Sequence, residues 1–599
     1  MRAIILAAGY GNRMRPITNS IHKTMLSING HTIIERIVSG LIENEILDII
    51  VVTGYRAKEV ESYLSTRFPE VNFEFIENRR FKETNNIFSL ALALDSVNID
   101  DDIVFIESDL IYEPKVIERV VKTKYDNVAL VCKYRSGMDG TVVSISGDVV
   151  TEVIPPHLQG DRFDFTDKYK TLNIYKFSKS FCRNEFKRLL TYYAKVIDDN
   201  CYYELILGIL IYLGRDTLHC EIIEDEKWAE IDDPNDLRVA EYIFDGKKRR
   251  ELLENGFGGY WTYDVLDFCF IRNMYFPGPS VLSEMRNNLN ELVYNYGSSQ
   301  YLLNQKLSYV VECAENRLIT LHGASQIYPI LREYFKGRKV LLPEPTFGEY
   351  PRIFPNNTVY SDKVGIMLKK MEDNVKDVEV VVIVNPNNPT GTVLPQEFIY
   401  YLLNKYPQKY FIVDESFIEF SDVPSVINSL EEKQLDNVIV IKSMSKTYGC
   451  PGLRLGYIYT CDNKLYNYIY ENIPIWNLNS MAEYMLEVIL KKKIEIHQSF
   501  IQTKKDREAF YRALSGIDYI KEAYRSHGNF ILLRINGKEF NGSDIVELML
   551  ERYSTYIKDV SHKFNDGDLY FRFAVRLPYE NELLIARFTE CLNSLSNKR

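Results

Sequence analysis

The sequence predicts an α/β protein made of two consecutive domains, and three observations support this. The chain has 599 residues, more than a single hydrophobic core usually serves. In the first half, short apolar runs alternate with helical patterns, as expected for a mostly parallel, doubly wound sheet. In the second half, further apolar runs each end in polar side chains. We place the domains at residues 1–245 and 260–599, with a linker at 246–259 where basic residues and glycines interrupt the pattern.

The composition argues against several classes of function. The net charge of −11 is unlike that of a general nucleic-acid-binding protein, so basic groups should gather only around small anions. No run of 18 apolar residues occurs, and we expect no membrane span. The nine cysteines contain no Cys-x-x-Cys pair and are typical of reduced thiols. We therefore expect a cytoplasmic protein.

The chain opens with a predicted strand and a phosphate-binding loop. An apolar run from Ala3 to Ala8 leads into Gly9-x-Gly11, and glycines let backbone N–H groups approach an anion closely. Met14 stands where a dinucleotide-binding loop has its third glycine, and no Gly-Lys-Ser/Thr follows. The loop therefore fits neither a Rossmann nor a Walker motif.

The remaining elements of the first domain follow in alternation. A helical pattern covers 33–43, and strand-like runs occur at 48–55, 71–76, 102–108 and 127–134. Ligands of such sheets lie at the carboxyl ends of the strands. We therefore expect charged, ligand-binding residues at those ends.

Basic and acidic side chains follow several of these predicted strands. Arg13 and Lys23 follow the opening loop and can neutralise a triphosphate. Asp109 ends one predicted strand and Asp232 follows a short strand later in the domain. Because Mg²⁺ prefers a few carboxylates plus phosphate oxygens, these two acids predict a magnesium site. Each acid alone could instead be a strand-end or helix-capping residue.

Residues 1–243 resemble the choline-phosphate-type cytidylyltransferases. The resemblance rests on Leu6–Pro16, Lys23, the segment 83–90, Asp109 and the closing Glu-Ile-Asp232. It implies that Lys23 and Arg13 hold the phosphates of CTP and act in catalysis, and that Asp109 and Asp232 bind Mg²⁺. It also implies a nucleotide site formed by Leu6, Ala8, Gly9, Gly11, Asn85, Asn86 and Ser89. Asn85 and Asn86 could instead begin a helix.

One departure from that family concerns the acceptor. The choline enzymes hold a quaternary ammonium with tryptophan and other aromatic groups, whereas the loop around Asp139 has no tryptophan. A carboxylate suits a primary ammonium, which donates three hydrogen bonds. Asp139 is therefore a candidate for binding a primary amine, although an Asp-Gly turn also explains it.

The second half contains polar residues at three strand ends. A strand at 380–384 enters an Asn-Pro-Asn-Asn388-Pro-Thr-Gly turn, and a second strand ends at Asp414. A third ends in Ser443-Met-Ser445-Lys446, and Arg454 follows. This set fits pyridoxal 5'-phosphate (PLP), which has a ring nitrogen, an aldehyde and a phosphate.

These segments resemble the class I/II aminotransferases of PLP fold type I. The resemblance implies that Lys446 forms the Schiff base and shuttles the proton, and that Asp414 pairs with the ring nitrogen. The other implied PLP-binding residues are Ala324, Ser325, Phe347, Asn388, Ser443, Ser445, Arg454 and, from the partner of a homodimer formed through this domain, Tyr296. Phe347 could instead be a core aromatic. Phe417 stands where the family often has a tyrosine.

Two arginines near the end fit a phosphorus oxyanion. Arg572 matches the substrate-carboxylate arginine of the family, and Arg576 is expected on the same face of one strand. Arg576 could instead have a structural salt bridge. This region most resembles the branch that acts on phosphorylated amino compounds, such as histidinol-phosphate aminotransferase and threonine-phosphate decarboxylase.

Both halves can share one substrate, 2-aminoethylphosphonate. The whole chain resembles phosphonate-specific cytidylyltransferases fused to an aminoethylphosphonate transaminase. This predicts a bifunctional enzyme that uses CTP, Mg²⁺, PLP, an amino-phosphonate and an amino donor or keto acceptor. One alternative keeps two enzymes but pairs a phosphocholine or phosphoethanolamine cytidylyltransferase with a histidinol-phosphate aminotransferase- or threonine-phosphate decarboxylase-like half. The other makes one half a non-catalytic dimerisation or sensing module.

Overall fold

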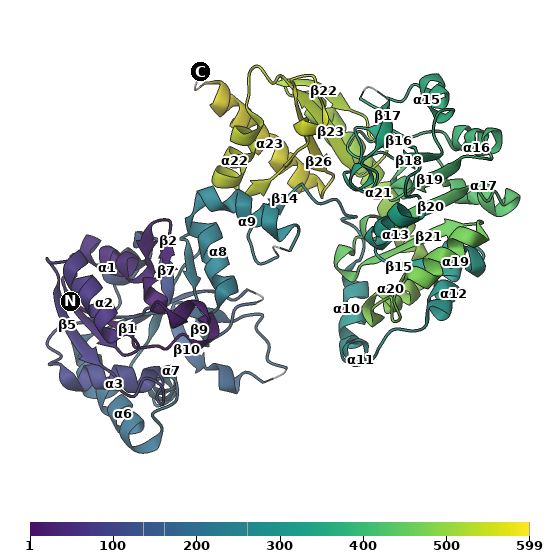
Figure 1. Ribbon diagram of the computed structural model, residues 1–599. Helices are drawn as coiled ribbons and strands as arrows, with labels where there is room; N and C mark the ends of the chain where they lie inside the picture. Colours follow the sequence, from purple (N-terminus) through teal and green to yellow (C-terminus); the bar gives the residue numbers. More distant parts are fainter. Residues whose placement is uncertain (136, 161, 260, 364, 598–599) are drawn as a thin grey trace. The chain divides into compact units, whose positions relative to one another are not determined.

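The computed structural model divides into two compact units, separated between Tyr263 and Asp264 (Figure 1). The residues it describes are 1–135, 137–160, 162–259, 261–363 and 365–597. The predicted second domain therefore begins and ends, at 260 and 598–599, on residues outside this description. The stretch 246–259, where we expected a linker, contains η7 (Gly246–Lys248) and α9 (Arg249–Gly256). The Arg249 guanidinium donates to the Tyr242 carbonyl at 2.7 Å and ties α9 to the first unit.

The first unit is built on a twisted sheet of nine strands within the described residues. In spatial order these are β5 (Asn72–Glu77), β4 (Asp48–Thr53), β1 (Arg2–Ala7), β6 (Ile103–Glu107), β11 (Tyr169–Phe177), β8 (Val128–Lys133), β12 (His219–Ile222), β10 (Val149–Ile154) and β9 (Val142–Ser146). Strands β5, β4, β1 and β6 pair in parallel, as predicted. The long strand β11 runs antiparallel between β6 and β8, which the strand pattern did not reveal.

Alternate residues of the central strands pack into two hydrophobic cores on opposite faces of this sheet. Ile5, Val51 and Ile106 face a core shared with α1 (Ile33–Glu43) and α4 (Pro114–Lys122). Ile4 and Val52 face a second core. The fully apolar strands are thus explained by burial on both faces. The remaining helices are α2 (Ala57–Arg67), α3 (Asn86–Ser96), α5 (Lys179–Phe181), α6 (Lys187–Tyr192), α7 (Glu204–Tyr212) and α8 (Pro234–Phe244).

The large sheet of the second unit has seven strands among the described residues. Their order is β15 (Leu318–His322), β21 (Leu455–Thr460), β20 (Val438–Ser443), β19 (Tyr410–Asp414), β18 (Val380–Val384), β16 (Val340–Glu344) and β17 (Asn357–Ser361). Only β21 runs antiparallel to its neighbours in this set. The parallel strands therefore present their carboxyl ends at one edge, which is where the predicted PLP residues lie.

Two further sheets complete this unit. A four-stranded antiparallel sheet has the order β22 (Ile520–Tyr524), β23 (Phe530–Ile535), β26 (Leu569–Ala574) and β25 (Lys558–Asp559). The short strand β14 (Leu266–Asp267) pairs in parallel with β24 (Thr555–Tyr556). Arg576 thus follows β26 and does not lie on it, contrary to the sequence expectation.

The second unit also contains fourteen α-helices within its described residues. They are α10 (Pro279–Asn287), α11 (Leu289–Tyr294), α12 (Gln300–Val311), α13 (Ile327–Tyr334), α14 (Glu349–Ile353), α15 (Leu368–Val375), α16 (Gln396–Lys405), α17 (Val426–Lys433), α18 (Met444–Thr447), α19 (Asn463–Asn472), α20 (Ser480–Lys491), α21 (Lys493–Ser515), α22 (Gly542–Tyr553) and α23 (Pro578–Ser596). Of these, α21, α22 and α23 lie beside the smaller sheets. One core includes side chains of α12, α16 and α20, and another includes side chains of α13 and α19.

The nine cysteines are free thiols, and six of them are buried. No helix within the described ranges combines the length and the hydropathy needed to cross a bilayer.

Candidate active sites

The loop after β1 folds around Gly11, which adopts a left-handed backbone conformation with φ 62°. A Cβ at this position would lie 3.1 Å from the Thr18 methyl group. The Thr18 hydroxyl donates to the Gly11 carbonyl at 2.9 Å, and the Met14 side chain is fully buried below the loop. Gly9 has open space where a side chain would project. The loop is therefore pinned at Gly11 and leaves its backbone accessible at Gly9.

The structure brings the predicted phosphate-binding cations and metal-binding acids together. Lys23 Nζ lies 3.2 Å from an Asp109 oxygen and 2.9 Å from an Asp232 oxygen. Arg13 pairs with Asp232 at 2.8 Å. Burial opposes the charge of Lys23, but the two carboxylates outweigh it and raise the Lys23 pKa.

The two carboxylates fit a divalent cation that also takes phosphate oxygens. Asp109 Oδ1 is buried and has no hydrogen-bond partner. Burial raises the Asp232 pKa, but Lys23 and Arg13 outweigh it, so the net shift is downward and the group is ionised. No cluster of three metal-binding side chains occurs in the described part of the chain. A metal held here would depend on Asp109, Asp232 and the nucleotide itself.

The residues predicted to bind the nucleotide base make hydrogen bonds within the first domain. Asn85 is the N-cap of α3, as the alternative interpretation proposed. Asn86 donates to Glu107 at 3.0 Å and accepts from the Tyr203 amide at 3.1 Å. Ser89 is buried and accepts from Asn78 at 3.0 Å.

The two apolar residues of the predicted nucleotide site contribute main-chain atoms. Leu6 and Ala8 are almost completely buried. Their carbonyls accept from Ser108 and Tyr55, both at 3.2 Å. Their side chains are thus part of the core.

A group of three glutamates lies beside the paired aspartates, with Glu204 buried and Glu107 and Glu230 half-buried. Glu107 and Glu204 are ordered by Asn86 and by Thr141, and Glu230 pairs with the buried Lys170 at 3.1 Å. Burial and neighbouring carboxylates raise the pKa of Glu107. Burial raises the pKa of Glu230 to about 7, although Lys170 opposes the shift. Three acids thus share one lysine.

Sequence reasoning missed this group. Glu107 and Glu230 lie two residues before the predicted metal ligands, which is a signal that could have been used. Lys170 lies on β11 and Glu204 on α7, and no spacing rule connects them. Tyr175 and Tyr203 add two buried hydroxyls without partners.

Asp139 lies in a different environment. Its side chain is 74% exposed and faces Arg13 at 3.5 Å. Its role as the amine-binding residue stays a prediction.

In the second unit, Lys446 lies on α18, directly after β20. It is largely buried, and no ion pair among the described residues includes it. Burial lowers its pKa to about 8, with further lowering by Arg572 and Arg454. The lowered pKa increases the fraction of neutral amine at neutral pH, and the neutral form is the one that attacks an aldehyde.

Asp414 provides the acid expected for the PLP ring nitrogen. It ends β19, is 3% exposed and accepts from the Tyr350 hydroxyl at 2.7 Å and the Ser416 hydroxyl at 2.6 Å. Burial raises the Asp414 pKa, although these two hydrogen bonds and the charge of Lys442 oppose the shift. A buried carboxylate at this position fits a protonated ring nitrogen.

The predicted phosphate-binding residues also converge. Arg454 donates to the Ser325 hydroxyl at 3.1 Å, and a Cβ on Gly323 would overlap its guanidinium. Ala324 and Ser325 belong to η9 (Ala324–Gln326), which precedes α13. Ser445 has a buried hydroxyl without a partner, and Ser443 pairs in register with Gly456, two residues after Arg454. These groups fit a phosphate at the edge of the sheet.

Three further predicted residues lie at the same edge. Arg572 donates to the Asn388 side chain at 2.9 Å and to the Cys269 carbonyl, while its Nε is buried without a partner. Phe347 is 37% exposed next to Tyr328. Phe417 packs against Phe530. The residues present therefore fit PLP.

Two residues that were predicted to bind substrate or cofactor instead contact other side chains of the same chain. Arg576 pairs with Glu580 at 2.7 Å and donates to the Asp267 carbonyl at 2.8 Å, which is the structural alternative. Tyr296 is 79% exposed and stacks on Trp476 of the same chain.

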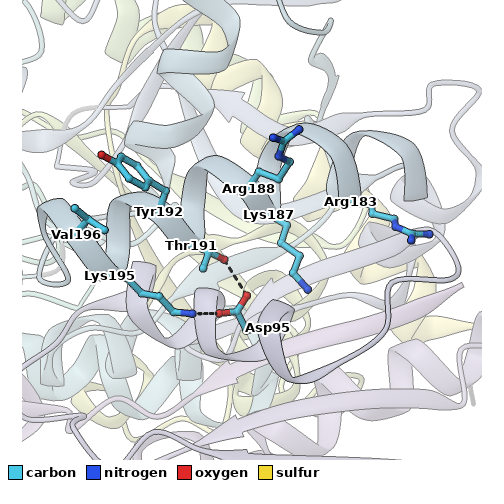
Figure 2. A pocket seen from close by; sticks show the side chains of 8 residues that line it. All are labelled: Asp95, Arg183, Lys187, Arg188, Thr191, Tyr192, Lys195 and Val196. Carbon is cyan, nitrogen blue, oxygen red and sulfur yellow. Dashed lines mark hydrogen bonds and ion pairs between the residues drawn. The ribbon is translucent and has the colours of Figure 1, made fainter.

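A basic pocket on the first unit contains none of the predicted site residues (Figure 2). Asp95 pairs there with Lys195 at 2.5 Å and accepts from Thr191 at 3.1 Å. The lining residues are Asp95, Arg183, Lys187, Arg188, Thr191, Tyr192, Lys195 and Val196.

Comparison with known proteins agrees with this division. The family model "Nucleotidyl transferase" matches residues 2–136, and "Aminotransferase class I and II" matches residues 274–577, just over half of the chain. The CMP-5'-(3-aminopropyl)phosphonate synthase of Streptomyces rubellomurinus is 26% identical over 603 positions, covering 98% of this chain and 95% of that protein.

Two further likenesses concern the second unit. An L-serine phosphate decarboxylase of Campylobacter jejuni is 27% identical, covering 53% of this chain and 87% of its own. The crystal structure of histidinol-phosphate aminotransferase from Sinorhizobium meliloti in complex with pyridoxal-5'-phosphate has a TM-score of 0.50 at 17% identity, over 58% of this chain and 94% of that one. This last likeness concerns the fold alone.

Taken together, the matches and the converging residues identify an enzyme with an N-terminal nucleotidyltransferase domain and a PLP fold type I domain. Through residues 274–577 the chain belongs to the aminotransferase class I and II family.

Proposed function

We propose that the chain is a bifunctional enzyme of phosphonate metabolism. The first domain transfers CMP from CTP to 2-aminoethylphosphonate, giving CMP-2-aminoethylphosphonate and pyrophosphate. The second domain interconverts 2-aminoethylphosphonate and phosphonoacetaldehyde by transamination with PLP. The observation that carries the proposal is the alignment of 98% of the chain with a protein named as a CMP-aminopropylphosphonate synthase.

In the first reaction, a phosphonate oxygen attacks the α-phosphorus of CTP, and the bond to the pyrophosphate oxygen breaks. Lys23 and Arg13, which contact Asp232 here, are the cations available to the triphosphate. When they turn to the nucleotide, Asp109 and Asp232 would be free to hold Mg²⁺. The metal charge would reduce the repulsion between the two anionic reactants.

The charge balance of the first site supports an acceptor with an ammonium group. In the described part of the chain, Glu107, Glu204 and Glu230 lie around one buried cation, Lys170. An ammonium group compensates such an excess of carboxylates and can donate three hydrogen bonds to them. The Glu204 Oε2 atom, buried and without a partner, is available as an acceptor.

A substitution at Glu230 tests this assignment. Glu230→Gln should raise the KM for 2-aminoethylphosphonate roughly tenfold, because a charge-assisted hydrogen bond is lost. The KM for methylphosphonate, which has no amine, should stay within about twofold of wild type. Asp139→Asn is the comparison variant. If only that variant raises the KM for 2-aminoethylphosphonate, the exposed acid binds the amine and the group of three glutamates does not.

In the second reaction, the residues of the chain have distinct tasks. PLP, when bound, supplies an aldehyde for the amine and a ring that accepts electrons. Lys446 would remove and return the proton at the substrate carbon that bears nitrogen. Asp414 would keep a proton on the ring nitrogen, and Arg454 with Ser325 would hold the cofactor phosphate.

The overall proposal is tested by following ³¹P signals of the full-length protein with CTP, Mg²⁺ and one acceptor at a time. The acceptors are 2-aminoethylphosphonate, 3-aminopropylphosphonate, phosphoethanolamine and phosphocholine. We expect the fastest release of pyrophosphate with 2-aminoethylphosphonate. A preference for phosphocholine would overturn the proposal.

A decarboxylase is the alternative function for the PLP domain, because that domain is similar to an L-serine phosphate decarboxylase. Transamination requires a keto acid as nitrogen acceptor, whereas decarboxylation releases CO₂ without one. Measuring CO₂ from a phosphorylated or phosphonylated amino acid, beside aldehyde formation from 2-aminoethylphosphonate, separates the two.

We also propose a cytoplasmic homodimer formed through the second domain. Apolar and aromatic side chains are exposed on α11 and near it, and such surface is typical of an interface. They include Leu289, Val293, Tyr294, Tyr296, Ile475 and Trp476. Light scattering during size-exclusion chromatography should give twice the mass of 70.0 kDa.

A further inference from the structure

Lys563 is a cation at the edge of the PLP-domain site that sequence reasoning did not select. It ends η12 (Ser561–Lys563), between β25 and β26. Its Nζ donates to the Thr346 carbonyl at 2.6 Å, directly before Phe347. A Cβ on Gly348 would lie 4.0 Å from the same nitrogen. Lys563 is therefore held against the loop that carries the predicted ring-stacking residue.

The surroundings of Lys563 are basic. Arg572 and Lys558 pair in register on β26 and β25, and both act on Lys563 as like charges. Burial lowers the Lys563 pKa to about 8, and these two cations lower it further. No ion pair found among residues 1–135, 137–160, 162–259, 261–363 and 365–597 includes Lys563, Lys558 or Arg572. Lys558 is exposed, Lys563 is half-buried, and Asp267 opposes part of the charge of Arg572. Three cations this close together nevertheless favour the binding of an anion.

The charges expected of the reactants decide which anion fits. The cofactor phosphate is accounted for by Arg454 and the serines near it. A single carboxylate of an amino donor needs one guanidinium, and Arg572 supplies it. A phosphonate or phosphate dianion needs a second cation. Arg576 was expected to be that cation, but it is paired with Glu580.

We propose that Lys563 and Arg572 together bind the dianionic phosphorus oxyanion of the amine substrate. Lys563 then distinguishes this substrate from the monoanionic amino donor, which uses Arg572 alone. The inference rests on the proposed function for the identity of the substrate. The geometry requires only a small amine or aldehyde with a phosphonate or phosphate group.

The test compares two half-reactions of the PLP-loaded, full-length protein, each followed through the cofactor absorbance. One uses 2-aminoethylphosphonate, and the other uses L-alanine, L-aspartate or L-glutamate, whichever reacts fastest with wild type. Lys563→Met should raise the KM for 2-aminoethylphosphonate roughly 30-fold or more, since a half-buried charge partner is lost. The KM for the amino donor should stay within about threefold. Lys563→Arg should restore most of the affinity for the phosphonate.

Two controls separate this effect from misfolding. Lys369→Met, on the exposed face of α15, should behave as wild type in both half-reactions. The CMP-transfer rate of Lys563→Met should also be unchanged. Equal KM increases for both substrates, or no increase for either, would overturn the inference.

A further measurement keeps the inference testable if 2-aminoethylphosphonate is not the substrate. Methylphosphonate should then still inhibit the amino-donor half-reaction of wild type competitively, and Lys563→Met should weaken this inhibition by at least tenfold. Inhibition that survives unchanged in Lys563→Met would contradict the role of Lys563. Inhibition lost with Lys563, alongside an inert 2-aminoethylphosphonate, would contradict only the proposed substrate.

Discussion

At the scale of single residues, the chemistry of the second site depends on cations that lie close together. Lys446 is near Arg572 and Arg454, and no carboxylate pairs with it directly in the described residues. Burial and these two guanidiniums favour the neutral amine. The arrangement that lowers the Lys446 pKa therefore also prepares the site for anionic reactants.

This arrangement predicts a pH dependence for uptake of PLP by the cofactor-free protein. Only a neutral amine attacks the aldehyde, and a pKa of about 8 for Lys446 makes that form dominant above pH 8. The uptake rate should rise about tenfold from pH 6 to pH 7 and level off above about pH 9. Stopped-flow absorbance measures it.

Arg572→Gln provides the comparison for this pH profile. Removing one of the nearby cations should raise the Lys446 pKa and move the plateau to higher pH. A wild-type rate that keeps rising to pH 10 would show that the pKa of Lys446 is not lowered. An unchanged plateau in Arg572→Gln would show that Arg572 does not contribute.

At the scale of elements, local sequence signals and the structure agree where the backbone itself sets the outcome. The helix predicted at 33–43 is α1, and its start has a capping box formed by Thr32 and Glu35. Asp233 before a proline begins α8 in the same way. The loop after β1 is set by Gly11, because a left-handed backbone and a close methyl group exclude a side chain there.

Two glycine variants of this loop should separate folding from binding. Gly11→Ala should reduce the free energy of unfolding by about 1–2 kcal/mol, because of the left-handed backbone. Gly9→Ala should leave stability unchanged, as its side chain would project into open space, but should raise the KM for CTP if phosphates approach that backbone. Thermal unfolding and pyrophosphate release measure the two effects. Equal losses of stability in both variants would contradict the separation.

At the scale of the whole molecule, the chain consists of two compact units with separate cores and separate candidate sites. The residues of each site come from one unit only. The two chemical activities should therefore be separable by substitution without dividing the chain.

Paired variants test this independence. Lys446→Ala should abolish the visible absorbance of bound PLP and the transamination, while CMP transfer stays within about twofold of wild type. Lys23→Met should reduce CMP transfer by at least 100-fold, because a charge on the triphosphate is no longer balanced, and should leave transamination intact. Loss of both activities in either variant would indicate coupling between the units.

The sequence by itself determined the class of each domain and the residues that follow the strands. Gly11, Lys23, Asp109, Asp414, Lys446 and Arg454 could be selected because glycines, charged residues and apolar runs stand at fixed spacings along the chain. From their spacing alone, both Arg572 and Arg576 were expected to bind the phosphorus oxyanion of the substrate. Only the tertiary structure separates them, since Glu580 neutralises Arg576 and leaves Arg572 for a ligand.

The sequence did not reveal the group of three glutamates or Lys563. Glu204 and Lys170 come from a helix and a strand far apart in the chain, and Lys563 contacts a loop more than 200 residues away. Burial and the sum of nearby charges set the pKa values and the ion pairs of these side chains. Neither quantity exists until the chain has folded, so the tertiary structure alone decides which charged groups remain available to a substrate.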